Sequence, residues 1–200
     1  MIYFFILFIL LTFSIYPEGF ITLWPPEKFE TERLYLRKPV IEDVVSIFEQ
    51  YAQDPEVTKF LTWQPHQSIN ESKLFLRRCS RVWQEGTSFP WVMIRKSDNQ
   101  LLGMIEIVGI DHAGALIGFV LSQNYWGLGY MTEAVKALIE WCLKQQNIFR
   151  VWAFCDVENI ASIRVLEKSG MQREGILRRW IKLPQLGQKP RDCYCYSLVK

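Results

Sequence analysis

The sequence predicts a single α/β domain in which a mixed β-sheet is flanked by helices. Runs of β-branched and apolar residues alternate along the chain with longer segments whose apolar residues recur at helical spacing. Glycines, prolines and short polar clusters separate these segments. The chain has 200 residues, half of them apolar and 14% aromatic, which is enough for one substantial core and argues against disorder.

The first half of the chain predicts three strands and two helices. The strand patterns cover residues 33–38, 89–95 and 101–110, and the helical patterns cover residues 40–53 and 70–84. Segment 55–65 contains prolines and a tryptophan and is expected to be a loop between the helices. Ser97-Asp98-Asn99-Gln100 predicts a hairpin turn between the second and third strands.

The second half predicts four strands and two helices. The strand patterns cover residues 115–121, 150–155, 172–182 and 193–199. One helix, residues 131–146, is expected to bury one face made of Ala134, Val135, Leu138, Ile139 and Cys142. The other helix begins after Asn159 as its cap and ends at Gly170.

A turn punctuated by glycines lies between strand 115–121 and helix 131–146. It reads Ser-Gln-Asn-Tyr-Trp-Gly-Leu-Gly-Tyr-Met-Thr-Glu-Ala over residues 122–134. Gly127 and Gly129 can adopt positive φ, and the unpaired N–H groups at the helix start point into the same space. Because a helix start carries roughly half a positive charge, the turn predicts a phosphate or pyrophosphate site built mainly from backbone.

Three kinds of phosphate-binding loop can be compared with this turn. A P-loop needs a lysine after its second glycine, but Tyr130 and Met131 follow Gly129. A G-x-G-x-x-G dinucleotide fingerprint would place its third glycine at Thr132, although Asp156 at the end of the next strand leaves that alternative open. The remaining pattern, [RQ]-x-x-G-x-[GA], resembles the pyrophosphate loop of the acetyl-CoA-dependent N-acetyltransferases of the GNAT superfamily.

Spaced motifs along most of the chain resemble the RimJ/RimL-like branch of GNAT. They are Glu30-Thr31-Glu32-Arg33-Leu34-Tyr35-Leu36-Arg37, Phe89-Pro90-Trp91, and residues 125–134, 149–156 and 158–171. The resemblance covers about residues 30–199 and implies the GNAT fold, a mixed, mostly antiparallel sheet flanked by helices. It also implies an enzyme that moves an acetyl group from acetyl-CoA, as co-substrate, to a primary amine by direct attack on the thioester.

The resemblance also implies which residues bind acetyl-CoA. The end of strand 115–121 would contact pantetheine and thioester, the loop would hold the pyrophosphate, and one residue before the last helix would contact the cofactor. In that order they are Phe119, Val120 and Leu121; Asn124, Trp126, Gly127, Leu128, Gly129, Tyr130 and Met131; and Asn159. Asn124 takes the place of the family's usual Arg or Gln, with Gln123 one residue earlier, and backbone N–H groups are expected to carry most of the contact.

Three side chains are considered for the proton transfers. The amine must lose a proton before it attacks, and the departing thiolate benefits from gaining one. The family's tyrosine acid corresponds here to Leu166, so resemblance to RimL-like proteins implies Ser162 as the acid; its other interpretation is an ordinary first-turn residue beside the cap Asn159. Glu106 is the candidate base, or else a solvated strand residue. His112 has a suitable intrinsic pKa, but a lone turn histidine is more often just exposed.

Composition argues against several other classes of protein. The formal charge is +2, from 23 basic and 21 acidic residues, without the basic stripe of a nucleic-acid binder. Five cysteines form no C-x-x-C pair and lie far in sequence from the two histidines, so no metal site is predicted. Scattered through predicted helices and strands, they indicate reduced, mostly buried thiols in a cytoplasmic protein.

Residues 2–16 are almost wholly apolar and precede the region of resemblance. This run of about 15 residues is shorter than a membrane span and lacks the positive region and cleavage site of a secretory signal. We interpret residues 1–28 as an N-terminal extension: an anchor, an unusual signal segment, or the product of a start site assigned too far upstream. The acetyltransferase domain is then residues 29–200, with peripheral membrane association only through residues 2–16.

The sequence leaves the acceptor amine open. The family branch implies protein N-termini, whereas related enzymes modify small molecules such as amino acids, aminoglycosides or polyamines. Trp63, Trp91 and Trp126 either line an acceptor pocket or pack in the core. Two other functions are a non-catalytic acyl-CoA-binding module and a dinucleotide-binding oxidoreductase. The oligomeric state is not predicted.

Overall fold

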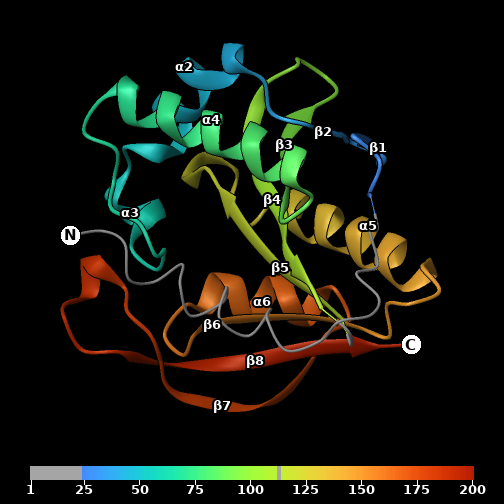
Figure 1. The fold of residues 1–200 in the computed structure, drawn as a ribbon. Coiled ribbons are helices and arrows are strands. Elements are labelled where there is room, and N and C mark those ends of the chain that lie inside the picture. The colour runs from blue at the N-terminus through green and yellow to red at the C-terminus, as the bar shows by residue number, and fades with distance from the viewer. Residues whose placement is uncertain (1–23, 112–113) are drawn as a thin grey trace.

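Eight strands form one sheet in the computed structural model, which describes residues 24–111 and 114–200 (Figure 1). The strands are β1 (Lys28–Glu30), β2 (Leu34–Arg37), β3 (Phe89–Arg95), β4 (Leu101–Ile110), β5 (Gly114–Leu121), β6 (Arg150–Asp156), β7 (Gln172–Ile181) and β8 (Arg191–Val199). Their order is β1-β2-β3-β4-β5-β6-β8-β7, and every neighbouring pair is antiparallel except β5 with β6. The prediction of a mixed, mostly antiparallel sheet is confirmed.

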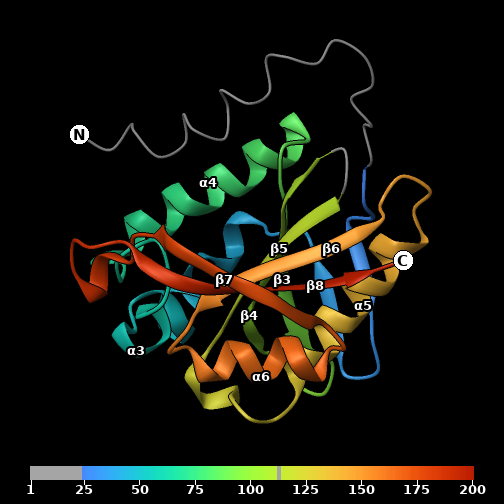
Figure 2. The same ribbon diagram turned by 90° about the horizontal axis from the view of Figure 1, so that it is seen from below.

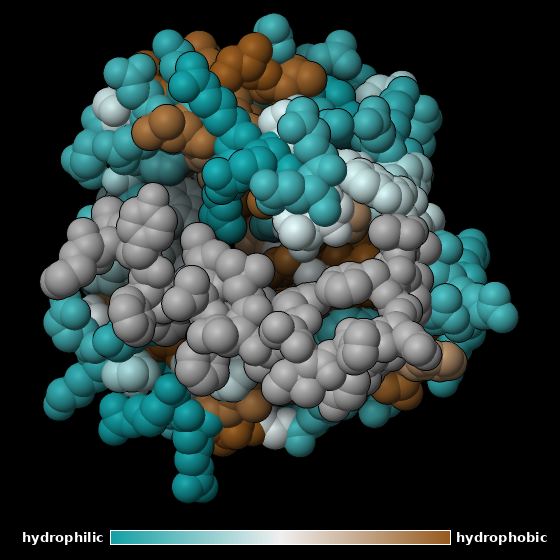
Figure 3. Space-filling view, viewed as in Figure 1, coloured by the Kyte–Doolittle hydropathy of each residue, from teal (hydrophilic) through white to brown (hydrophobic). Residues whose placement is uncertain are grey.

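Helices cover both faces of this sheet (Figure 2). They are α2 (Val44–Ile47), α3 (Pro55–Thr58), α4 (Ile69–Glu85), α5 (Tyr130–Lys144) and α6 (Ile160–Lys168), with helical turns at Ile41–Asp43 and Phe48–Ala52 on either side of α2. Exposed apolar side chains gather on the surface over α2 and the turn before it (Figure 3). Strand β4 separates two cores: Met104 belongs to the core beneath α2 and α4, whereas Ile105 belongs to the larger core beneath α5 and α6. Successive strand residues point to opposite faces, so one strand serves both cores.

The last two helices follow from their sequences as expected. The buried face of α5 includes all five predicted residues: Ala134, Val135, Leu138, Ile139 and Cys142. At the start of α6 the Asn159 side-chain oxygen accepts a hydrogen bond from the N–H of Ser162 at 3.1 Å. The chain leaves α6 at Gly170, whose φ of +90° suits a residue without a side chain.

The structure differs from the predicted elements at α3 and β1. Helix α3 lies inside the expected loop 55–65, because the Asp54 carboxylate caps it and Pro55 occupies its first position. Strand β1 pairs with β2 but has three residues, too few for an alternating pattern to reveal.

Contacts of the sheet with the preceding chain begin before residue 29. The Trp24 ring packs edge-on against Phe89 with centroids 5.7 Å apart, and the Pro26 carbonyl accepts a hydrogen bond from the Trp91 indole at 3.1 Å. The domain boundary at residue 29 stays a prediction. The apolar run 2–16 and His112 lie outside the described residues. No helix of the described ranges is long and apolar enough to cross a membrane.

Candidate active site

Strands β5 and β6 run parallel and then separate (Figure 1). They pair from Gly114 to Leu116, opposite residues 150–152. Beyond that point β5 stays paired with β4 up to Leu121, whereas β6 stays paired with β8 up to Asp156. The edge of β5 that faces β6 is therefore without a neighbouring strand. Unpaired N–H and C=O groups on such an edge can bind an extended ligand.

The three residues predicted to contact pantetheine lie on this open part of β5. Phe119 and Leu121 are partly buried against the core beneath α5, and Val120 is partly buried against the core beneath α4. Contact of these residues with acetyl-CoA stays a prediction. Their position beside an unpaired backbone edge is compatible with that contact.

The loop after β5 leaves room for a ligand. The Trp126 indole donates a hydrogen bond to the Leu121 carbonyl at 2.8 Å, which holds the loop against the end of the strand. Gly127 and Gly129 have φ of +77° and +81°, and a Cβ on Gly127 would meet no atom within 4 Å. The Ser122 hydroxyl at the base of the loop is buried and has no hydrogen-bond partner in the described part of the chain.

The first turn of α5 presents free donors to this loop. Its first hydrogen bond runs from the N–H of Glu133 to the carbonyl of Gly129 at 3.0 Å. The N–H groups of Gly129, Tyr130, Met131 and Thr132 have no acceptor among the described residues. Four unpaired donors and the positive end of the helix dipole suit the binding of an anion, and the phosphate site at this turn stays a prediction.

Five of the predicted loop residues are exposed, and three of them besides the two glycines carry side chains. They are Asn124, Trp126 and Leu128, and their side chains are available to a ligand that arrives from solvent. The predicted residues of β5, the loop and the start of α5 follow one another along the chain from residue 119 to residue 131. The Met131 side chain is buried in the larger core, so its backbone N–H is the part left for a ligand.

Two more predicted residues lie at the start of α6: Asn159, the predicted cofactor contact, and Ser162, the predicted acid. The Asn159 oxygen is occupied as a cap, which leaves its side-chain N–H groups for a ligand. Ser162 is partly buried, and its hydroxyl makes no hydrogen bond to a described residue, so it can donate elsewhere. Leu166 is 1% exposed within the larger core. A group at position 166 would therefore lie in the core.

Glu106 lies on the other face of the sheet. It is opposite Gly118 of β5 and on the same side of β4 as Met104, toward α4. The Ser88 hydroxyl donates a hydrogen bond to its carboxylate. Burial raises the pKa of Glu106, although this hydrogen bond and the charge of Arg78 lower it in part. A partly buried carboxyl with a raised pKa is suited to accept a proton near neutral pH.

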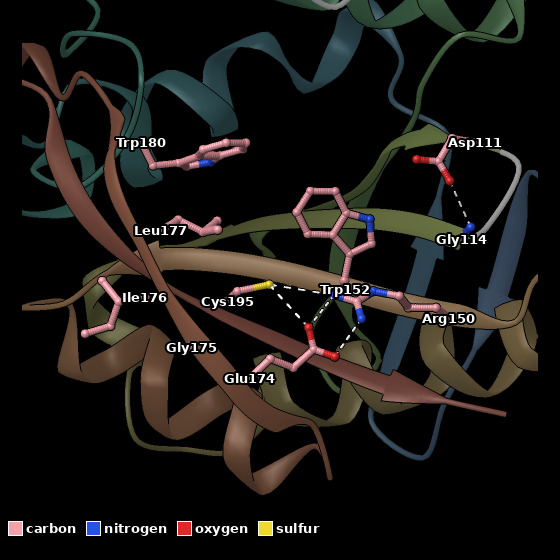
Figure 4. A pocket seen from close by; sticks show the side chains of 10 residues that line it. All are labelled: Asp111, Gly114, Arg150, Trp152, Glu174, Gly175, Ile176, Leu177, Trp180 and Cys195. Atoms are coloured by element: carbon pink, nitrogen blue, oxygen red, sulfur yellow. Dashed lines mark hydrogen bonds and ion pairs between the residues drawn. The ribbon is translucent and has the colours of Figure 1, made fainter.

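A cavity of about 480 Å³ opens on the face of the sheet away from α5 and α6 (Figure 4). Val151 and Ala153 point into the core beneath those helices, so Trp152 between them points to the opposite face. Trp152 pairs with Leu116, the last residue of β5 before the two strands separate. The cavity is lined by Asp111, Gly114, Arg150, Trp152, Glu174, Gly175, Ile176, Leu177, Trp180 and Cys195. The cavity therefore borders the paired part of β5 and β6 and reaches, at Trp152, the point where the two strands separate.

The charges in this cavity are largely paired and its walls are apolar. Arg150 donates two hydrogen bonds to the two carboxylate oxygens of Glu174, both at 2.6 Å. These bonds, together with one from the Ser197 hydroxyl, lower the pKa of Glu174. Ile176 is 54% exposed and Trp180 is 47% exposed, although both are large apolar residues. An apolar group bound here would remove this surface from water.

The tryptophans singled out in the sequence do not line this cavity. Trp91 is fully buried in the larger core, Trp63 packs against the smaller one, and Trp126 lies in the loop. The cavity is walled instead by Trp152 and Trp180, which the sequence analysis missed. The sequence of residues 150–155 contains a signal for Trp152. Val151, Ala153 and Cys155 alternate with it and face the core, so Trp152 is expected on the other face of the strand.

The remaining sequence candidates are accounted for by structure. The buried Asp156 carboxylate accepts hydrogen bonds from Arg191, which argues against its use for a ribose hydroxyl. All five cysteines are buried and unpaired, and burial raises the pKa of Cys142 to about 12. Residues 24–111 and 114–200 contain no group of three or more side chains suited to hold a metal ion.

Comparison with known proteins gives matches over most of the chain. The model of the acetyltransferase (GNAT) domain matches residues 33–172. The uncharacterized N-acetyltransferase p20 of Bacillus licheniformis is 33% identical over 178 residues, which are 87% of this chain and 97% of that protein. The ribosomal protein uS5-alanine N-acetyltransferase of Escherichia coli is 23% identical over 78% of this chain and 84% of its own length. The structure of the microcin C7 self-immunity acetyltransferase MccE, in complex with acetyl-CoA and AMP, superposes with a TM-score of 0.79 at 22% identity and covers 88% of this chain and 98% of that one.

Proposed function

The chain belongs to the GNAT acetyltransferase family and is an acetyl-CoA-dependent N-acetyltransferase, and we propose that the amine it acetylates is the N-terminus of a peptide. The observation that carries this proposal is the apolar cavity next to the point where β5 and β6 separate. One wall of the cavity is formed by Ile176, Leu177 and Trp180 of the exposed edge strand β7, and these apolar residues suit the side chains of an extended chain. The E. coli relative, named for an N-terminal alanine of a ribosomal protein, supports the same class of acceptor.

The acetyl-CoA contacts follow the segment from β5 to α5. Pantetheine pairs with the open edge of β5 at Phe119, Val120 and Leu121, and the pyrophosphate binds the unpaired N–H groups at the start of α5. The exposed side chains of the loop flank it, and Asn159 contacts the cofactor from the start of α6. With these contacts the thioester would lie where β5 and β6 separate.

The proton transfers come from opposite faces of the sheet. On the α4 face, Glu106 takes the proton of the amine as its nitrogen attacks the thioester carbonyl carbon. An unpaired N–H of β5 stabilises the oxyanion of the tetrahedral intermediate. The carbon–sulfur bond then breaks, and Ser162 of α6 donates a proton to the departing thiolate and regains one from water. The raised pKa of Glu106 and the unpartnered hydroxyl of Ser162 support these two roles.

The acceptor class is tested with the purified full chain, acetyl-CoA and a panel of amines. We expect mass spectrometry to find the acetyl group on the α-amine of short peptides with an apolar second residue, and not on matched peptides with a blocked N-terminus. Acetylation of small amines alone, or of lysine side chains alone, would refute the peptide proposal.

A pair of variants connects this activity with the cavity. Trp180→Ala should raise the KM for the peptide at least about 10-fold with little change in the KM for acetyl-CoA, because it removes one apolar wall. Leu74→Ala is the matched control, since Leu74 is an exposed apolar residue on α4 outside the cavity. Equal effects of both substitutions on the peptide KM would contradict the assignment of the cavity.

The family match does not support the two other functions considered from the sequence. The matched family and relatives are acetyltransferases, which supports acetyl transfer over a non-catalytic acyl-CoA-binding module or an oxidoreductase. The cytoplasmic location and the peripheral membrane contact through residues 2–16 stay predictions, because the run lies outside the described residues.

A further inference from the structure

Arg33 and Glu133 join the first β-hairpin to the start of α5 across 100 positions of sequence. The backbone N–H of Arg33 donates to one carboxylate oxygen of Glu133 at 2.8 Å, and its side-chain Nε donates to the other at 2.6 Å. The Thr31 hydroxyl donates to the first of these oxygens as well. Three donors from one turn therefore hold a single carboxylate in the first turn of the helix.

The guanidinium of Arg33 also reaches the glycine loop. Its Nη1 donates to the carbonyl of Leu128 at 3.0 Å, and its plane lies over the Tyr130 ring at 4.4 Å from the centroid. A trans peptide unit is planar, so the carbonyl of residue 128 and the N–H of Gly129 point in opposite directions. By drawing the carbonyl toward itself, Arg33 turns the N–H of Gly129 away, toward the side where the pyrophosphate would bind.

Arg33 has a second effect through charge. Thr31 and Arg33 lower the pKa of Glu133 more than burial raises it, so the carboxylate is ionised at neutral pH. An unpaired carboxylate in this turn would repel an anion bound at the same helix start. The ion pair with Arg33 neutralises that charge.

We propose that Arg33 is a positioning residue for acetyl-CoA: it aims the loop N–H groups at the pyrophosphate and neutralises Glu133 beside it. The inference rests on the acetyl-CoA contacts of the proposed function and is independent of the acceptor. It predicts that a substitution outside the loop and outside α5 weakens the binding of the pyrophosphate portion of the cofactor.

Calorimetry without an acceptor tests this inference on the full chain. Arg33→Ala should weaken acetyl-CoA binding about 10- to 100-fold. The double variant Arg33→Ala/Glu133→Gln should recover a measurable part of that loss, because it removes the uncompensated charge. Arg33→Gln retains a donor and some packing on Tyr130, serves if the alanine variant does not fold, and should fall between wild type and Arg33→Ala.

Arg37→Ala is the matched control. Arg37 lies in the neighbouring strand β2, is exposed to a similar degree as Arg33 (35% against 41%), and binds Asp43 through two hydrogen bonds at 2.8 and 2.6 Å, without contact to the loop. Its acetyl-CoA affinity should stay within about two-fold of wild type.

A truncated donor separates positioning from general damage. Turnover of S-acetylpantetheine, which lacks the pyrophosphate, should be nearly unchanged in Arg33→Ala, measured with whichever amine proves to be the best acceptor. Acetyl-CoA affinity within two-fold of wild type in the folded Arg33→Ala protein, or a double variant that binds no tighter than Arg33→Ala, would overturn the inference. If no peptide in the acceptor panel is acetylated, the proposed acceptor is refuted. The acetyl-CoA affinities still test the role of Arg33, because they are measured without an acceptor.

Discussion

Glu106 of β4 lies directly opposite Gly118 of β5, two residues beyond the last position at which β5 pairs with β6. Directly opposite residues of antiparallel strands point to the same face. Gly118 has no side chain there, and a Cβ on it would approach a methyl group of Val108 to 3.3 Å. The carboxyl of Glu106 is therefore next to a part of β5 that has no side chain of its own on this face and is approached there by Val108.

The first prediction is that Glu106→Gln lowers kcat about 100-fold or more at neutral pH, because the amine loses its base. The loss should shrink as pH rises, since the amine then deprotonates unaided. Profiles of kcat against pH for both proteins test this. A defect of the same size at every pH would show that Glu106 orients the acceptor and takes no proton.

A second prediction concerns the stability linked to the same carboxyl. Burial raises its pKa in the folded protein above the unfolded value, so its favourable contribution is fully present below the unfolded pKa and is lost as pH rises through the folded pKa. The melting temperature of Glu106→Gln relative to wild type should therefore increase from pH 4 to pH 8. A difference that stays constant over this range would contradict the raised pKa.

The third prediction separates chemistry from helix structure in α6. If Ser162 protonates the thiolate, Ser162→Ala should lower kcat about 100-fold with little change in acetyl-CoA affinity. Ser169→Ala is the control, because the Ser169 hydroxyl donates to the Val165 carbonyl at 2.7 Å at the other end of the same helix. It should leave kcat unchanged. A Ser162→Ala defect confined to cofactor affinity would make Ser162 a binding residue.

The fourth prediction tests the anion site at the start of α5. Gly129→Glu should abolish acetyl-CoA binding, because it brings a carboxylate to the pyrophosphate and blocks the approach of the backbone. Gly170→Glu is a close match: φ is +90° against +81°, and the nearest atom to an added Cβ is 3.4 Å away at both positions. Both variants should lose similar stability, but only Gly129→Glu should lose acetyl-CoA. Unchanged affinity in folded Gly129→Glu would refute the loop assignment.

Local sequence patterns predicted most of the fold for physical reasons. The buried face of α5, the cap Asn159 and the helix end at Gly170 each depend on residues within a few positions of one another. The glycine loop was recognisable for the same reason, since its free N–H groups result from the helix start itself. The family resemblance implies a mixed sheet, but no pattern predicts which strands pair in parallel, and the pairing of β5 with β6 is seen only in the structure.

Long-range contacts account for the features that the sequence did not reveal. The bond of Arg33 to Glu133 and the position of Trp152 and Trp180 on the same cavity depend on strand order, which no local pattern contains. In the sequence, Glu133 is not distinguishable from any acidic residue that stabilises the first turn of a helix. Its partner becomes visible once β2 is placed beside the start of α5.

The last prediction concerns the N-terminal extension, and the contacts of Trp24 and Pro26 make it sharper. A chain that starts at Trp24 should be soluble, retain full activity and melt within about 2 °C of the complete protein, because it keeps every described contact.

A chain that starts at Lys28 loses the acceptor of the Trp91 indole and the ring contact with Phe89. It also loses the Glu27 carbonyl, which accepts a hydrogen bond from the N–H of Lys38 at 2.8 Å. Each lost hydrogen bond costs about 1 kcal/mol, which corresponds to roughly 2–4 °C in a domain of this size, so this chain should melt at least about 4 °C below the complete protein. If residues 2–16 form an anchor, the complete chain should sediment with lipid vesicles and both shortened chains should not. Failure of the chain from Trp24 to fold would show that residues 1–23 belong to the domain.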